Sequence, residues 1–308
     1  MIVTAPAMIN GNTKYSNSLP EKETTKPFYS SAVIRKFIDH PMVMGIRAVA
    51  VMTSGSAIAA NATLINSAVI KSPAAVAVAA PVPEPVPAAA SDLSAAKAAK
   101  AAELRIVMYQ AALIYARMDL EDQGLNQKAF EYAWRGYHNM LKKGLIRKRS
   151  VLSICDFSQS SRTKRMYVID VQHRKLLYRT YVAHGQNSGD EYATTFSNEP
   201  DSYKSSLGFY VTQRTYIGHN GLSLKLSGVD SGFNDMALKR QIVLHGSAYV
   251  SDRYMQDYGT LGTSLGCPAL PAAISGKIIR TVKDGSVLFI YHPTQQYLSH
   301  STVINGYM

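Results

Sequence analysis

The chain has 308 residues, of which 46% are hydrophobic and 18% are charged, so a packed core is expected and a wholly disordered protein is excluded. Its two cysteines, Cys155 and Cys267, are too few for a disulfide scaffold or a multi-cysteine metal site. The formal net charge is +12, with +3 in residues 1–104 and +9 in residues 105–308. This basic excess fits an anionic partner such as a nucleic acid, lipid headgroups or a cell-wall polymer.

The N-terminal region predicts a tail followed by an export segment. Residues 1–40 are largely polar and irregular, which indicates a disordered tail. Residues 41–70 form an apolar stretch behind the basic pair Arg35-Lys36, without the run of 18 apolar residues typical of a membrane-spanning helix. We interpret this stretch as an export signal or as a membrane tether, which predicts a protein of the periplasm or cell envelope.

Residues 71–103 form an alanine- and proline-rich linker. Within it, residues 73–102 hold 14 Ala and 5 Pro. The alternating prolines of residues 81–87 favour an extended polyproline spacer, whereas the Ala/Lys half, Ser91–Ala102, is expected to be helical and to lead into the next helix. The linker either tethers a folded domain or has no role beyond its length.

Residues 104–150 show the periodicity of a helical hairpin that packs on the domain behind it. Apolar residues recur there at three- and four-residue steps, and Gly144 is expected to end the second helix. The apolar positions are Leu104, Met108, Ala111, Ala112, Tyr115 and Met118 in the first helix, and Phe130, Ala133, Trp134, Tyr137, Met140, Leu141 and Leu145 in the second.

From Val151 to the end of the chain the pattern is that of strands. Residues 166–171 and 175–182 are separated by a short polar turn and predict a β-hairpin. Further strands are expected at 208–212, 222–226, 241–244 and 286–291. Because no long helices separate these strands, residues 151–308 predict an α+β, mainly-β domain and not a doubly wound sheet.

A histidine and a cysteine mark the candidate site. His245 is expected to close a strand, and Cys267 follows 22 residues later in a glycine-rich turn. A thiol needs a nearby base to become a nucleophile, and a neutral imidazole can take its proton. Cys155, in contrast, lies in an apolar run and is expected to pack in the core.

The segments His245-Gly246 and Ser264-x-Gly266-Cys267 resemble the signature of the YkuD-like L,D-transpeptidase catalytic domain. The continuation Pro268-Ala269 is similar to the branch of that family whose motif ends in Gly-Cys-Pro-Ala. The resemblance spans about residues 104–295. It implies an α+β, mainly-β catalytic domain preceded by a helical hairpin.

The resemblance also implies a reaction on peptidoglycan stem peptides. Cys267 would attack the carbonyl of the third stem residue and release D-Ala, leaving a thioester that the side-chain amine of a second stem resolves as a 3→3 cross-link. His245 would be the base and acid, and the Gly246 carbonyl would orient its ring. The oxyanion donors would be the backbone N–H groups of Gly266 and Cys267, Ser264 matches the motif serine, and no cofactor or metal is implied.

The chain departs from the common motif beside the thiol. Leu265 stands where most members have a second histidine that helps to bind substrate. Five residues are candidates for this binding role: His184, His219, Ser247, Tyr249 and Arg253. Donor and acceptor specificity therefore do not carry over from the family.

Two other functions compete with transpeptidation. Water in place of the acceptor amine would make the protein an L,D-carboxypeptidase that uses the same thioester. A non-catalytic wall-binding module is the alternative from another class, although such a module has no need for a reactive thiol beside a base. A nucleic-acid partner is not expected, because the basic charge comes without a recognition motif.

Overall fold

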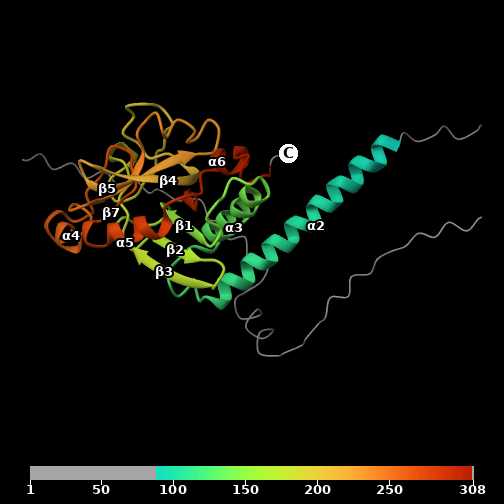
Figure 1. Ribbon diagram of the computed structural model, residues 1–308, viewed down its shortest axis with the longest axis horizontal. Helices are drawn as coiled ribbons and strands as arrows, with labels where there is room; N and C mark the ends of the chain where they lie inside the picture. The colour runs from blue at the N-terminus through green and yellow to red at the C-terminus, as the bar shows by residue number, and fades with distance from the viewer. Residues whose placement is uncertain (1–87, 307–308) are drawn as a thin grey trace, which may run out of the picture. The chain divides into compact units, whose positions relative to one another are not determined.

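The computed structural model describes residues 88–306, so the predicted tail, the export segment and the proline-rich part of the linker lie outside the described residues. The first described element is helix α2 (Ala88–Arg117), blue-green in Figure 1. It begins inside the alanine-rich segment, whose Ala/Lys half the composition predicts to be helical, because alanine has the highest helix propensity. The helical hairpin therefore starts at Ala88, earlier than the predicted boundary at residue 104.

Helix α3 (Gln127–Lys142) packs against α2 and is capped at both ends. The Asn126 side chain accepts hydrogen bonds from two backbone N–H groups of the first turn. At the other end, Gly144 has a positive φ of 67°, and the N–H groups of Gly144 and Leu145 donate to carbonyls of the last turn. This pattern is a Schellman motif, and it confirms the predicted end at Gly144.

Eight strands form one sheet in the order β3-β2-β1-β8-β4-β5-β6-β7. The pairs β1–β8 and β6–β7 are parallel and the other neighbours are antiparallel. The strands are β1 (Val151–Asp156), β2 (Met166–Asp170), β3 (Lys175–Thr180), β4 (Gly208–Gly218), β5 (Gly221–Gly228), β6 (Val243–Ser247), β7 (Ala269–Pro271) and β8 (Val287–Tyr291). The predicted α+β, mainly-β fold and the β2–β3 hairpin are confirmed.

Strand β6 differs from its predicted bounds in a way that concerns the site. Gln241, expected to begin the strand, has a positive φ of 56° and lies in the turn before it. Strand β6 instead runs on to Ser247, because residues 245–247 pair with β7. His245 therefore lies in the middle of a strand and not at its end.

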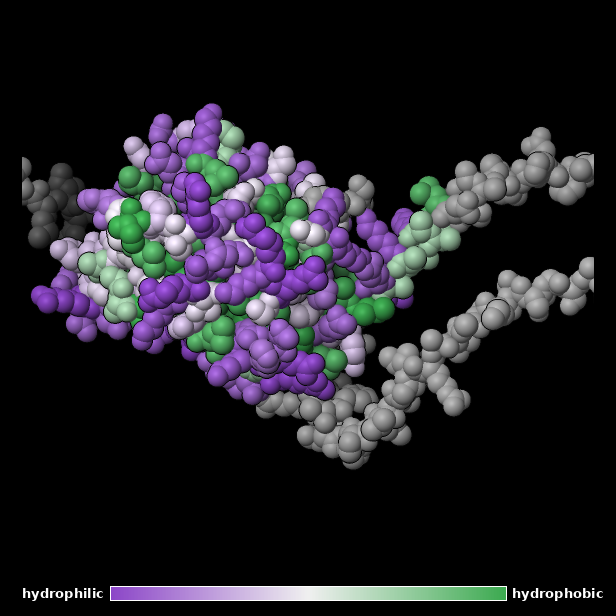
Figure 2. All heavy atoms as spheres, in the orientation of Figure 1, coloured by the Kyte–Doolittle hydropathy of each residue, from purple (hydrophilic) through white to green (hydrophobic). Residues whose placement is uncertain are grey.

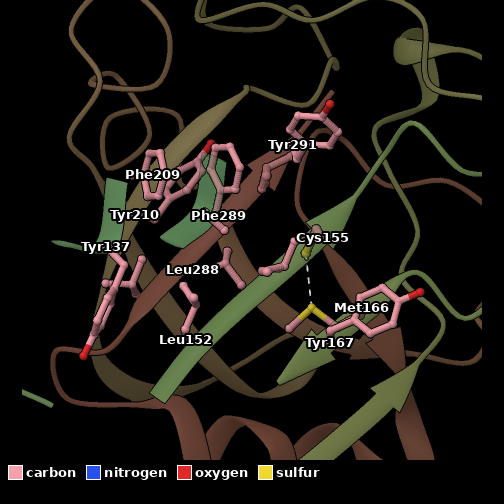
Figure 3. Close-up of a cluster of buried hydrophobic side chains, with 14 of the residues drawn as sticks. Tyr137, Leu152, Cys155, Met166, Tyr167, Phe209, Tyr210, Leu288, Phe289 and Tyr291 are labelled. Carbon is pink, nitrogen blue, oxygen red and sulfur yellow. Dashed lines mark hydrogen bonds between the residues drawn. The ribbon is translucent and has the colours of Figure 1, made fainter. Parts of the chain in front are cut away.

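The core includes buried side chains of α3 and of strands β1, β2, β4 and β8, some of which are drawn in Figure 3. The rings of Phe209 and Phe289 stack with their centroids 4.1 Å apart. Cys155 is fully buried, and its thiol donates to the Met166 sulfur at 3.2 Å. Burial raises the pKa of Cys155 to about 12, so this thiol stays protonated. The prediction that Cys155 is a core residue is confirmed.

Three further helices and one 3-10 turn complete the domain. Helix α5 (Ala272–Val282) follows β7 directly and packs on β5, β6 and β7, which places it behind the predicted site. The others are η1 (Gln186–Ser188), α4 (Asp252–Tyr258) and α6 (Gln295–His300). The face shown in Figure 2 carries mostly hydrophilic residues. None of the helices within residues 88–306 is long and apolar enough to cross a membrane.

Candidate active site

The register of β6 and β7 brings the predicted nucleophile and base to the same part of the sheet. His245 pairs with Ala269, which lies two residues after Cys267. Extended backward by two residues, this register places Cys267, in the turn before β7, level with Val243, which lies two residues before His245. The Cys267 sulfur accepts a hydrogen bond from the Val243 N–H at 3.4 Å. His245 therefore lies on the strand next to the segment that follows Cys267.

The hydrogen bond of His245 defines the state of its ring. Nδ1 lies 3.0 Å from the Gly246 carbonyl oxygen, which can only accept, so Nδ1 carries the proton. In the neutral ring this leaves a lone pair on Nε2. Burial lowers the pKa of His245, although the bond to Gly246 acts in the opposite direction. The imidazole is thus a neutral base at neutral pH.

Gly246 is a glycine because helix α5 packs against its α-carbon. A Cβ at this position would lie 2.3 Å from Ser275 Oγ and 2.9 Å from Ser275 Cβ, which is closer than real Cβ contacts. This close packing of Ser275 against Gly246 fixes the distance between β6 and α5. The carbonyl that orients His245 is therefore set by packing behind the strand.

The Cys267 thiol is half-buried and protonated at rest. Burial raises its pKa, while the Val243 N–H and the Arg240 charge lower it. Within the described residues no hydrogen bond joins its sulfur to His245, and the thiol lies 3.8 Å from the Gln241 carbonyl oxygen. A neutral thiol beside a neutral imidazole suits proton transfer during attack, and not a preformed ion pair.

The turn before Cys267 is held by Ser264. Its hydroxyl donates to the Cys267 carbonyl at 2.6 Å and accepts from the Gly266 N–H at 3.1 Å. The Gly266 N–H, one of the two predicted oxyanion donors, therefore already donates to Ser264 in this structure, and the Cys267 N–H is the other candidate donor. Gly266 has a φ of 117°, so its role is to allow this backbone conformation.

His184, a predicted substrate-binding residue, is buried behind this turn. Arg165 donates to its Nδ1 at 2.7 Å, so Nε2 carries the proton and lies 2.8 Å from the Gly189 carbonyl. Burial and the Arg165 charge lower the pKa of His184 to about 4. Both ring nitrogens are occupied, so His184 is not placed to bind a substrate. Its carbonyl instead accepts from the Ser264 N–H at 2.9 Å and supports the turn.

The four other binding candidates separate into two groups. Ser247 and Tyr249 are half-buried at the end of β6, and Tyr249 interacts electrostatically with Cys267 and packs where a Cβ on Gly262 would be. His219 is exposed in the turn between β4 and β5. Arg253 is exposed on α4, where its guanidinium lies 3.9 Å from Asp257. Among these four, Tyr249 is the residue with an interaction with the thiol within the described residues, and Ser247 interacts with Tyr249.

Arg240 was not predicted, although it is the cation that acts on the thiol. It is half-buried, and its guanidinium donates to the carbonyls of Ser197 and Lys204, at 2.7 Å each, and to two serine hydroxyls of the same loop. A Cβ on Gly266 would lie 3.3 Å from its Nη2. Arg240 thus ties the loop of residues 197–206 to the catalytic turn. The only sequence signal was its position just before the strand that carries His245.

The chain was then compared with known proteins. A family model described as the L,D-transpeptidase catalytic domain matches residues 121–291. A comparison with curated proteins gives no match. The matched residues make up more than half of the chain and include the whole site described above.

Several solved structures are similar at low identity. An L,D-transpeptidase from Mycobacterium smegmatis is 11% identical with a TM-score of 0.29, and the alignment covers 46% of this chain and 59% of that one. An L,D-transpeptidase from Stackebrandtia nassauensis is 13% identical with a TM-score of 0.28, over 54% and 67%. The helical cell shape determining protein Pgp2 from Campylobacter jejuni is 14% identical with a TM-score of 0.30, over 56% and 62%. The chain spans less than two thirds of the M. smegmatis protein.

Proposed function

Because the chain belongs to the L,D-transpeptidase catalytic domain family, we propose that it is a cysteine-dependent L,D-transpeptidase acting on peptidoglycan stem peptides. The observation that carries the proposal is the His245 Nδ1–Gly246 hydrogen bond on the strand that pairs with the Cys267 segment. It provides a base with a free Nε2 lone pair, two residues along the sheet from a half-buried thiol. This is what acyl transfer through a thioester requires.

The proposed reaction has two halves. In the first, Cys267 Sγ attacks the carbonyl carbon of the third stem residue while His245 Nε2 takes the thiol proton, and the oxyanion forms beside the Cys267 N–H. The imidazolium returns the proton to the amine of D-Ala, which leaves as the thioester forms. In the second half, the side-chain amine of another stem attacks the thioester and loses a proton to His245. The thiol is then regenerated and a 3→3 cross-link remains.

The same thioester supports the second candidate, an L,D-carboxypeptidase. Water would take the place of the amine, and the product would be a tripeptide stem without a cross-link. The half-buried thiol and neutral imidazole serve either acceptor equally well. A non-catalytic wall-binding module is disfavoured because Cys267 is only partly buried and lies two residues before the residue that pairs with His245.

The place of action is part of the proposal. Peptidoglycan lies outside the cytoplasm, so the protein must be exported, to the periplasm or cell envelope. The segment at residues 41–70 would act as export signal or membrane tether. The net charge of +12 favours approach to an anionic wall.

The test incubates the full chain with a disaccharide tetrapeptide and follows the products by mass. Loss of D-Ala with dimer formation supports transpeptidation, and loss of D-Ala without a dimer supports the carboxypeptidase. Cys267→Ala should abolish both products. Lys175→Ala, an exposed change on β3 at the opposite edge of the sheet from β7, should leave both unchanged. Equal product from wild type and Cys267→Ala would refute thiol catalysis.

A further inference from the structure

A second site lies between α2 and α3, away from the thiol. A cavity of about 190 Å³ opens there, where α2 passes beside α3 (Figure 1). Helix α3 packs on β1 and β8, whereas the thiol lies beside β6 and β7. The cavity therefore takes no part in the chemistry proposed above. Its walls are Lys100, Glu103, Leu104, Val107, Arg135, His138, Asn139, Lys142, Lys143, Asn305 and Gly306.

The charge of these walls is strongly positive. Four cationic side chains line the cavity against one carboxylate, Glu103. That carboxylate already forms an ion pair with Lys142. Lys100 and Arg135 therefore face the space without a carboxylate from the described walls, and the cavity attracts an anion.

Arg135 is the centre of the argument because its charge is half-buried and poorly partnered. Burial lowers the pKa of its guanidinium. Its hydrogen-bond partner among the described residues is the Asn305 side-chain oxygen, at 3.5 Å. A guanidinium has five N–H donors in a planar fork that matches oxyanions, and leaving such donors desolvated and unpaired is unfavourable. An oxyanion in the cavity would remove this penalty.

One further donor belongs to the α2 wall of the cavity. His138 lines the cavity from α3 beside Arg135, but its Nε2 is buried away from the open space, so it is not available to a ligand there. Lys100 reaches across from α2 toward the end of the described chain, where a Cβ on Gly306 would lie 3.8 Å from its ammonium nitrogen. Cationic donors from both helices, Arg135 on α3 and Lys100 on α2, suit an oxyanion held between them. Leu104 and Val107 add an apolar wall beside them.

We propose that this cavity binds a phosphate ester, with the phosphate between Arg135 and Lys100 and a short organic group against Leu104 and Val107. The phosphate can belong to a small soluble ester or to the headgroup of a phospholipid. Both sources present the same chemistry to the site. The site is independent of the thiol and of the function proposed above.

The experiment uses the full chain and two probes. Glycerol 3-phosphate is titrated by calorimetry, and vesicles of phosphatidylglycerol are compared with vesicles of phosphatidylcholine by co-sedimentation. We expect Arg135→Gln and Lys100→Gln each to weaken binding about tenfold or more. The matched control Lys175→Gln removes one exposed positive charge from β3 and should bind as wild type does.

The outcomes distinguish between the two sources of the phosphate, and they also show when the proposal is wrong. Binding of glycerol 3-phosphate that Arg135→Gln abolishes supports a soluble ester, and vesicle binding alone with the same sensitivity supports the headgroup. Equal loss in Arg135→Gln and Lys175→Gln means nonspecific attraction and overturns the proposal, as does no binding of either probe. Arg135→Lys keeps the positive charge but removes the planar guanidinium. It replaces Arg135→Gln in these measurements if Arg135→Gln does not fold. The alkylation rate of Cys267 should not change in any folded variant.

Discussion

The contact between Gly246 and helix α5 gives the sharpest prediction. Gly246→Ala places a methyl group 2.3 Å from Ser275 Oγ and 3.3 Å from the Ala272 α-carbon. The helix or the strand must move, and overpacking of this kind destabilises a protein by about 1–3 kcal/mol. A movement of β6 also displaces the carbonyl that holds the His245 ring. We therefore expect a loss of both stability and activity.

A second substitution tests the cause directly. Ser275→Gly removes the two atoms nearest to the new methyl group, and the next nearest is the Ala272 α-carbon at 3.3 Å. Alone it should cost about 0.5 kcal/mol, because glycine is a poorer helix residue than serine. Combined with Gly246→Ala it should recover at least about 1 kcal/mol relative to the sum of the single changes. D-Ala release should recover in the same variant.

The measurement is urea unfolding of the four proteins that make the double-mutant cycle, together with D-Ala release. The matched control is Gly276→Ala, one residue further along α5, where a Cβ would meet only the flexible end of Arg280 at 3.5 Å. That change should be neutral or stabilise the helix by up to about 1 kcal/mol. Additive energies in the cycle would refute the claim that Ser275 is what requires glycine at position 246.

Three other predictions concern charge and exposure. The pH at which iodoacetamide alkylates Cys267 at half its maximal rate should lie above the ordinary thiol pKa, because burial raises the pKa of Cys267. Arg240→Met should move this midpoint pH higher, because the Arg240 charge lowers the same pKa. An unchanged midpoint in a stopped assay would contradict this. The free energy of unfolding should fall by roughly 3 kcal/mol as the pH drops from 6.5 to about 4. Over this range His184 becomes protonated in the unfolded chain but stays largely neutral in the folded protein, because burial and the Arg165 charge lower its folded pKa to about 4. His184→Gln should make the free energy of unfolding less dependent on pH over this range. Leu265→Ser should raise KM for the stem peptide severalfold with stability within about 0.5 kcal/mol of wild type, since Leu265 is 64% exposed; a large stability loss would show a scaffold role.

Most of the fold could be predicted because its signals are local. The caps of α3, the apolar face of that helix and the hairpin of β2 and β3 depend on residues a few positions apart. The start of α2 at Ala88 could not be placed from the sequence, because an alanine-rich sequence is compatible with both a linker and a helix. The strand order could not be predicted, because the parallel pairs β1–β8 and β6–β7 join segments that are distant or short.

The site was predictable only where a motif fixed the residue type. His245, Gly246 and Cys267 follow from the resemblance to the family motif, and the register pairs His245 with the residue two positions after Cys267. His184, a predicted binding candidate, is buried with both ring nitrogens hydrogen-bonded. Its burial depends on Arg165, a residue 19 positions earlier in the chain. No sequence pattern links these two residues.

The departure at Leu265 concerns substrate choice more than the scaffold. Ser264 is fixed by hydrogen bonds to the Cys267 carbonyl and the Gly266 N–H, and Gly266 by a φ of 117°. Leu265 lies between them with 64% of its surface exposed, so neither packing nor backbone conformation demands leucine or histidine there. The conformation of the turn that presents the thiol therefore does not depend on residue 265, the position that differs from the common motif. The leucine at position 265 should therefore affect the binding of a substrate over Cys267.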